Sequence, residues 1–265
     1  MAVTGENHRR LRPRPLLVAG LLSIANLFLH KPISDILDAL YSRVGRNRYE
    51  TIGLIGIGAL CTVAALPAMR RVGTTLSLTW LPLSLSGLAA ITVATQHWLL
   101  VTNIELIHFP QFALMSVLFL AAGVSPKWAW ALGSLAGALD ESYQHLVIYA
   151  DVPGTYFDIN DILLNSIGAA WGVCLFGAAR LAEDGPLLDR RAAVMAAIAL
   201  AALVLVAFVI DPPDTTLLRP AATRRLYRVL STGEGLLGIG AIAALVELSS
   251  HPRRGRRRNS GPSAE

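Results

Sequence analysis

The chain has 265 residues, of which 54% are hydrophobic and only 15% are charged, and its mean hydropathy is +0.52. Soluble domains carry about 25% charged residues, so this composition argues against a soluble protein and is typical of a membrane protein. The net charge of +5 does not indicate a nucleic-acid partner, because the basic residues lie mainly between the apolar runs and at the ends of the chain.

Several successive apolar runs are long enough to cross a hydrocarbon layer roughly 30 Å thick as helices, which takes about 17 to 25 residues each. The runs are rich in Leu and Ala and lack the period-2 alternation of a membrane barrel. The sequence therefore predicts an all-α, polytopic membrane helix bundle of about eight transmembrane helices over 14–249. The runs lie at 14–30, 51–69, 77–98, 104–123, 127–148, 160–180, 192–210 and 232–249.

The distribution of the 23 Lys and Arg residues predicts the orientation in the cell membrane. Most of them fall on one side if the N-terminus is inside, so both termini are predicted to be cytoplasmic, as a basic tail at 1–13 and a disordered basic tail at 250–265. The hairpin at 150–157 is then outside. Two long outer connections, 30–50 and 211–230, mix apolar and basic residues and are expected to lie on the outer surface as interfacial helices.

Two further patterns are given structural interpretations. Cys61 and Cys174 fall within predicted helices, so a disulfide or a metal pair is not expected. The stretch "GEGLLG" at 233–238 matches the G-x-G-x-x-G dinucleotide pattern, which has meaning only between a strand and a helix. Because no strand is predicted before it, close helix packing explains its glycines better.

Three of the predicted helices carry a polar stripe on one face, and in the predicted topology all three stripes lie at the outer ends. Ionisable residues in membranes usually face a bundle interior or a water-filled cavity, so we expect the stripes to converge. The stripes consist of Glu105 and His108 in 104–123, of Asp140, Glu141, Gln144 and His145 in 127–148, and of Asp158, Asp161 and Asn165 in 160–180.

Close approach of the helices 127–148 and 160–180 is indicated by a G-x-x-x-G motif in each, "GSLAG" at 133–137 and "GAAWG" at 168–172. Small residues at this spacing let two helix backbones approach. The two motifs predict a tight helical hairpin.

The order "ELIHFPQF", "DESYQ", a short hairpin and "FDINDILLNSIGAAWG" resembles the VanZ-like family of multi-pass membrane proteins over residues 104–176, with a core at about 104–180. The family pattern has a His-bearing helix, then E-x-x-Q, then D-x-x-D-x-x-x-N-x-x-G. Thr155 stands where many relatives carry an Arg, so no role of that Arg is carried over. The resemblance implies a cell-envelope protein, related to one associated with low-level resistance to the glycopeptide teicoplanin, and no defined activity. The pattern falls on Glu141, Gln144, Asp158, Asp161, Asn165 and Gly168.

The chemistry of the stripes leaves several functions open. So many carboxyls, with only His108 and His145 as candidate cations, require protonated carboxyls or a bound cation. A divalent cation could be held by Glu141, Asp158 and Asp161, because oxygen ligands suit Mg²⁺, Ca²⁺ or Mn²⁺, and His together with carboxylates could also serve Zn²⁺. In the alternative structural interpretation, the polar residues hydrogen-bond across helices and cap helix ends.

The leading hypothesis is a membrane protein that binds or modifies an amphipathic ligand at its outer face, such as a lipid-linked cell-wall precursor. Its catalytic groups would be His108, Glu141 and Asp161, with Glu105, Gln144, Asp158 and Asn165 as ligand-binding residues. A proton- or ion-coupled transporter is the first alternative, although transport sites usually lie near the membrane midplane. A non-catalytic membrane scaffold is the second.

Overall fold

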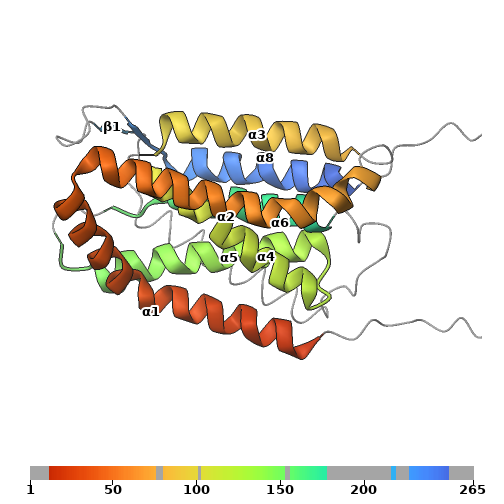
Figure 1. The fold of residues 1–265 in the computed structure, drawn as a ribbon, viewed down its shortest axis with the longest axis horizontal. Coiled ribbons are helices and arrows are strands. Elements are labelled where there is room, and N and C mark those ends of the chain that lie inside the picture. The colour runs from red at the N-terminus through yellow and green to blue at the C-terminus, as the bar shows by residue number, and fades with distance from the viewer. Residues whose placement is uncertain are drawn as a thin grey trace, which may run out of the picture.

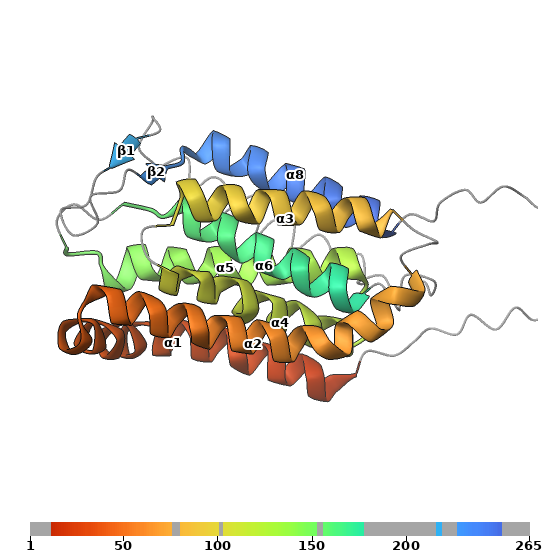
Figure 2. The same cartoon turned by 45° about the horizontal axis from the view of Figure 1, so that its top comes forward.

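The fold is a bundle of helices that run side by side (Figures 1 and 2). The computed structural model describes residues 12–75, 80–100, 103–152, 156–177, 216–218 and 227–250. The predicted helix 192–210 and the tails 1–11 and 251–265 lie outside these residues. The α-helices are α1 (Pro13–Val44), α2 (Arg46–Thr75), α3 (Leu81–Trp98), α4 (His108–Ala121), α5 (Pro126–Tyr143), α6 (Ile159–Gly177) and α8 (Thr232–Ser250).

Two short helical segments extend this set at the polar end of the bundle. A 3-10 helix, η1 (Asn103–Ile107), leads directly into α4. A π-helix, η2 (Gln144–Ile148), continues α5. With these extensions, the predicted helices 104–123 and 127–148 both form close to their predicted bounds.

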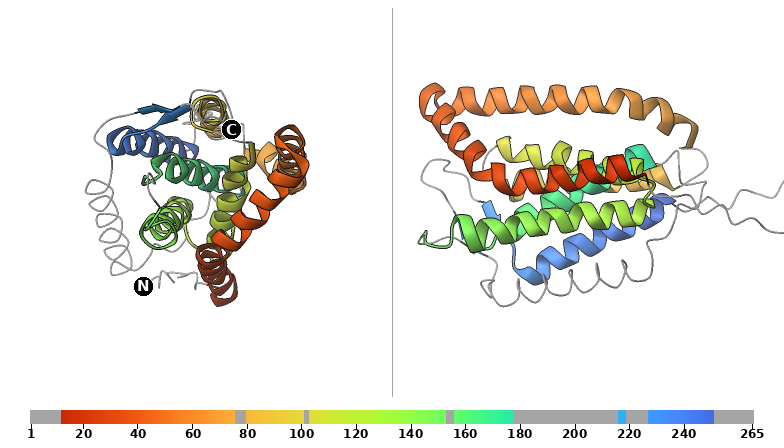
Figure 3. Two further views of the ribbon diagram at one scale, coloured as in Figure 1. Left: turned by 90° about the vertical axis from the view of Figure 1, so that its left-hand side faces the viewer. Right: turned by 90° about the horizontal axis from the view of Figure 1, so that it is seen from below.

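Helix α6 is the centre of the bundle. Figure 3 (left) looks along the helices and shows α6 between α3, α4, α5 and α8. In its apolar stretch 78% of the residues are buried, against 6% for α1. Large apolar side chains of the outer helices face outward instead, among them Phe28 and Ile36 of α1, which are 65% and 67% exposed. An apolar outer surface around a packed core is what a lipid environment requires.

Four helical segments are long and apolar enough to cross a membrane, namely Pro13–Val44, Ile104–Ala121, Ile159–Gly177 and Thr232–Ser249. Helices α2, α3 and α5 form where they were predicted but are not among these four. The chain is therefore a helical membrane protein, while eight crossings are not confirmed. Cys61 is exposed and Cys174 is buried, and both are free cysteines.

The glycines of α6 determine how closely α4 approaches it. A Cβ atom on Gly168 would lie 2.8 Å from the carbonyl oxygen of His108, and one on Gly172 would lie 2.8 Å from the Cα of Ala113. The "GAAWG" motif therefore faces the backbone of α4, whereas the sequence predicted contact with α5. The prediction was wrong about the partner because α6 is surrounded on all sides, so its glycines do not have to serve its neighbour in sequence.

The glycines of α5 do face α6, as predicted. A Cβ atom on Gly133 would lie 3.1 Å from the Cβ of Ala169, and one on Gly137 would lie 2.5 Å from the Cβ of Asn165. The "GSLAG" motif thus brings α5 against α6 next to a polar residue of the predicted site. Small residues allow this approach because no side chain separates the two helices.

The first predicted helix and the connection after it form one continuous helix. Helix α1 continues through 31–44 despite Pro32 in its interior. Figures 1 and 3 show it changing direction before it reaches α2, as expected where a proline removes one backbone hydrogen bond and bends a helix. Gly45, with a φ of 75°, ends α1. The interfacial helix predicted at 30–50 is therefore not a separate element.

The second predicted interfacial helix, 211–230, is wrong in its described part. Strands β1 (Thr216–Leu218) and β2 (Tyr227–Val229) pair there as an antiparallel hairpin. The side-chain amide of Asn160 holds β2 from its other side: it donates to the carbonyl of Arg228 at 2.7 Å and accepts from the N–H of Leu230 at 3.0 Å. These backbone groups thus find hydrogen-bond partners in an extended segment, so the segment does not need to form a helix to satisfy them.

A strand thus precedes "GEGLLG", contrary to the expectation from the sequence, since β2 ends at Val229 and α8 begins at Thr232. The strand is part of an antiparallel hairpin and not of a βαβ unit, which dinucleotide binding requires. Gly238 lies close to α6, where an added Cβ would be 2.8 Å from Leu163. Close helix packing accounts for this glycine, as the sequence indicated.

Candidate functional site

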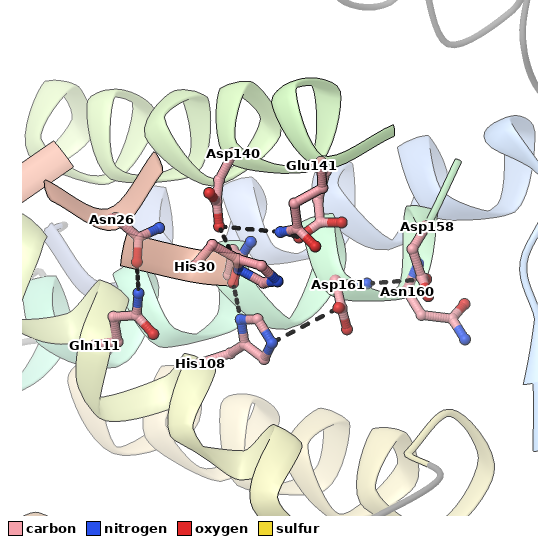
Figure 4. A network of polar contacts seen from close by, with 11 residues as sticks. Asn26, His30, His108, Gln111, Asp140, Glu141, Asp158, Asn160 and Asp161 are labelled. Atoms are coloured by element: carbon pink, nitrogen blue, oxygen red, sulfur yellow. Dashed lines mark hydrogen bonds and ion pairs between the residues drawn. The ribbon is translucent and has the colours of Figure 1, made fainter. Parts of the chain in front are cut away.

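The predicted polar residues meet at one end of the bundle, where three helices begin or end. His108 opens α4, Glu141 lies in the last turn of α5, and Asp161 lies in the first turn of α6. Figure 4 shows their side chains in one network. The connection between α1 and α2 and the β1–β2 hairpin lie at the same end (Figure 2).

His108 is held between two residues of α6. Its Nδ1 lies 2.7 Å from Oδ1 of Asn165, and its Nε2 lies 3.6 Å from Oδ2 of Asp161. The first contact is a hydrogen bond, and the second is an electrostatic contact, too long for a hydrogen bond. With Nδ1–H donating to the amide oxygen, the neutral imidazole keeps its lone pair on Nε2, toward Asp161. This arrangement suits His108 to accept a proton.

Asn165 is completely buried and orients this ring. Its Nδ2 has no hydrogen-bond partner within the described part of the chain. The Asn165 amide fits against α5 only because residue 137 is a glycine: a Cβ atom on Gly137 would lie 2.8 Å from Nδ2. The "GSLAG" motif therefore also makes space for a site residue.

Glu141 and Asp140 are held by a single amide. Nε2 of Gln144 donates to Oε1 of Glu141 at 2.9 Å and to Oδ2 of Asp140 at 3.2 Å. Both carboxyls are buried, with only 3% and 2% of their residues exposed. Gln144 is the first residue of the π-helix η2, and single π-turns of this kind are frequent at functional sites. Glu141 also interacts electrostatically with Asp161 and Asp158 across the two helices.

Asp158 has a structural role at the start of α6. Its Oδ1 accepts hydrogen bonds from the backbone N–H of Asn160 at 2.9 Å and of Asp161 at 3.3 Å. This is the geometry of a helix N-cap, which the structural interpretation of the sequence included. Burial raises the pKa of the Asp158 carboxyl, and the two backbone N–H donors partly oppose this effect. A ligand-binding role for Asp158 stays a prediction.

Two of the residues predicted from the stripes lie at the margin of this network. Glu105, in η1, has His108 and Tyr49 of α2 as electrostatic neighbours. His145, in η2, contacts the ring of Phe157 edge-on at 5.8 Å between centroids. His145 was predicted as a candidate cation for the carboxyls, and its position against an aromatic ring gives that role no support.

Polar residues of α1 join the network, which the sequence reasoning missed. Nδ1 of His30 lies 3.9 Å from Oδ2 of Asp140. Asn26 accepts a hydrogen bond from Gln111 of α4. Asn26 and His30 are spaced i, i+4 in an apolar run, the same signal that identified the other stripes, so they could have been found.

The predicted divalent cation has no preformed site among the described residues, since no three His, Cys, Asp or Glu side chains there are arranged to hold a metal ion. The proposed ligands Glu141, Asp158 and Asp161 are near enough to interact electrostatically. Asp158 meanwhile uses one carboxyl oxygen to cap α6. Cation binding therefore stays a prediction.

A bundle of long apolar helices with a buried polar cluster defines a multi-pass membrane protein. Residues 54–180, nearly half of the chain, match the model of the VanZ/LLP1 family, and this match is consistent with a VanZ-like protein. The match contains His108, Glu141, Asp161 and Asn165, and it also includes most of α2 and all of α3, which the sequence motifs did not assign to the family. Comparison with curated proteins and with solved structures gives no significant match.

Proposed function

We propose that this protein binds an amphipathic ligand at the outer face of the cell membrane and that His108 and Asp161 transfer a proton to or from the head group. The observation that carries this proposal is the placement of His108 between Asn165 and Asp161. A buried amide that fixes one ring nitrogen leaves the other available for acid–base chemistry. The side chains of His108 and Asp161 are 12% and 22% exposed, so a head group can reach them.

The position of the cluster supports a surface ligand better than a transported one. His108, Glu141 and Asp161 lie within one end of the bundle, at helix termini. Transport sites usually lie near the middle of the membrane between repeated halves. A lipid-linked cell-wall precursor is the ligand class we propose, because its head group would lie at the depth of this cluster while its tail remains in the lipid.

His108→Gln is expected to abolish this function, because Gln cannot accept and release a proton near neutral pH. The resemblance to the teicoplanin-associated family supplies a first assay: expression of the wild type in a susceptible bacterium should raise the teicoplanin concentration needed to stop growth. Native mass spectrometry with a purified lipid-linked cell-wall precursor measures binding directly.

The matched control is His97→Gln, since His97 is an exposed histidine at the end of α3 that stacks edge-on against Trp98. It should behave as the wild type in both assays. Equal resistance and equal binding for the wild type and His108→Gln would refute the proposed role of this histidine.

The topology is proposed from the basic residues: both termini cytoplasmic and the 150–157 hairpin outside. In a Cys61→Ser background, which removes the exposed native cysteine, Asp151→Cys should react with an impermeant maleimide in intact cells, because Asp151 is an exposed residue of this hairpin. Lys127→Cys, at the opposite end of α5, should react only after lysis. The reverse pattern would invert the topology.

A further inference from the structure

The side chain of Asn160 binds one edge of strand β2. In a strand, the carbonyl of one residue and the N–H of the residue two positions later lie on the same edge. Asn160 bonds both groups: its Nδ2 donates to the carbonyl of Arg228 at 2.7 Å, and its Oδ1 accepts from the N–H of Leu230 at 3.0 Å. Strand β1 pairs with β2. Asn160 thus occupies the place that a further strand would take.

This contact between α6 and β2 is buried. Only 3% of Asn160 is exposed, and only 2% of Val229, which lies between the two bonded residues of the strand. Leu230 packs against a buried apolar cluster that contains Phe157 and Ile159, at the start of α6. A buried amide without hydrogen-bond partners is costly, so the strand and the amide of Asn160 stabilise each other in this position.

Asn160 directly precedes Asp161, one of the two residues of the proposed acid–base pair. Successive residues of an α-helix point about 100° apart, so these two side chains face different sides of the first turn of α6. Figure 4 shows the amide of Asn160 directed away from His108 and the carboxyl of Asp161 directed toward it. A rotation of this turn about the helix axis would move both side chains. Holding Asn160 on one side therefore fixes the direction of Asp161 on the other.

The first turn of α6 depends on contacts from outside the helix, because the first N–H groups of a helix have no partner within it. Asp158 supplies a local contact, since its Oδ1 accepts from the N–H groups of Asn160 and Asp161. The amide of Asn160 adds a contact to a residue that is 68 positions away in the sequence. Helix ends with few contacts open more easily than the centre of a helix, so this distant contact orders the turn.

We propose that Asn160 is a positioning residue of the polar site: by binding the edge of β2, it holds the first turn of α6 in the orientation in which Asp161 faces His108. Strand β2 lies outside the residues 54–180 that match the family. The orientation of a site residue is thus fixed by a part of the chain beyond the family match. The proposal extends the site on which the proposed function rests, but its first measurement needs no ligand.

Hydrogen–deuterium exchange on the full-length protein in detergent tests this proposal, because an amide N–H exchanges faster when its hydrogen bond opens more often. In Asn160→Ala, the peptide with Leu230 and the peptide with Asp161 and Ile162 should both exchange several-fold faster than in the wild type. A peptide around the buried Ala169, in the middle of α6, should be unchanged and shows that the variant is folded.

Asn160→Asp is the second variant, because it keeps nearly the same shape and an acceptor for the N–H of Leu230 but loses the amide donor to the carbonyl of Arg228. Exchange at both places should then rise, by less than in Asn160→Ala. Faster exchange at Leu230 with an unchanged first turn of α6 would show that Asn160 only holds the strand, and it would overturn the positioning role. Unchanged exchange at both places would overturn it as well.

Arg228→Leu is the matched control, since the exposed side chain of Arg228 pairs with Glu234, whereas Asn160 bonds only the backbone carbonyl of Arg228. It should leave the exchange of both peptides unchanged. Native mass spectrometry with a purified lipid-linked cell-wall precursor adds a second readout: Asn160→Ala should bind it several-fold more weakly and Arg228→Leu as the wild type does. Equal binding by Asn160→Ala and a binding wild type would contradict the positioning role. A wild type that binds no precursor would refute the proposed function, while the exchange measurements would still decide the role of Asn160.

Discussion

Asp161→Asn and Glu141→Gln are each expected to abolish function while the protein remains folded and inserted. Each substitution keeps the shape of the side chain but removes a charge from a group of buried carboxyls that interact with one another. Less like-charge repulsion and a lower desolvation cost then leave the stability unchanged or raised. Resistance or ligand binding measures the function, and thermal unfolding in detergent measures the stability.

A purely structural role for these two residues gives the opposite result. Losing a needed charge-assisted hydrogen bond would cost roughly 1.5 to 3 kcal/mol and lower the melting temperature of both variants. Asp151→Asn, an exposed carboxyl at the same end of the bundle, controls for a general loss of charge. The interpretation as a functional site would be wrong if both site variants melted lower and kept their function.

The same unfolding experiment decides whether a divalent cation binds. A cation that binds only the folded protein raises its melting temperature by mass action. If the carboxyls of Glu141, Asp158 and Asp161 hold Mg²⁺, Ca²⁺ or Zn²⁺, the wild type should respond to the added ion and Asp161→Asn should not. An equal response of both proteins would place the bound ion elsewhere.

Gly172→Ala is expected to destabilise the bundle by about 1 to 3 kcal/mol, the usual cost of overpacking a core. The added Cβ would lie 2.8 Å from Cα of Ala113 and 2.9 Å from its carbonyl carbon, and these backbone atoms cannot rotate away as a side chain can. Helices α4 and α6 must then separate. The melting temperature in detergent measures the loss.

The matched control is Gly240→Ala in α8, where an added Cβ meets no atom within 4 Å. Alanine favours helices over glycine by roughly 0.5 to 1 kcal/mol, so this variant should be as stable as the wild type or slightly more stable. If Gly172→Ala melted together with Gly240→Ala, the close approach of α4 and α6 would not contribute to stability.

Local patterns in the sequence were sufficient to find most helices and the residues of the central cluster. Apolar runs with helical spacing placed α3, α4, α5, α6 and α8 close to their observed positions. The i, i+3, i+4 spacing of polar residues predicted the shared faces on α4, α5 and α6. Both signals depend only on residues within a few turns of each other, so they survive without knowledge of the tertiary fold.

The contacts between segments that are distant in sequence could not be predicted from such local patterns. His30 meets Asp140, and Asn160 holds the backbone of β2, although neither pair is close in sequence. No local periodicity specifies such a partner, because many helices could have occupied the same side of α5 or α6. The partner is selected by the packing of the whole bundle, in which each buried polar group must find a hydrogen bond or an opposite charge.

The amino-acid sequence by itself therefore determined that this is a helical membrane protein with a polar cluster carried by α4, α5 and α6, because composition and periodicity directly reflect burial in lipid or in a helix face. Only the tertiary structure decided that "GAAWG" faces α4, that 216–229 contains a β-hairpin, and that α1 contributes His30 to the site. These three outcomes depend on which surfaces meet in the folded bundle. The free energy of each contact depends on both of the surfaces that meet, so one segment of the sequence does not determine it alone.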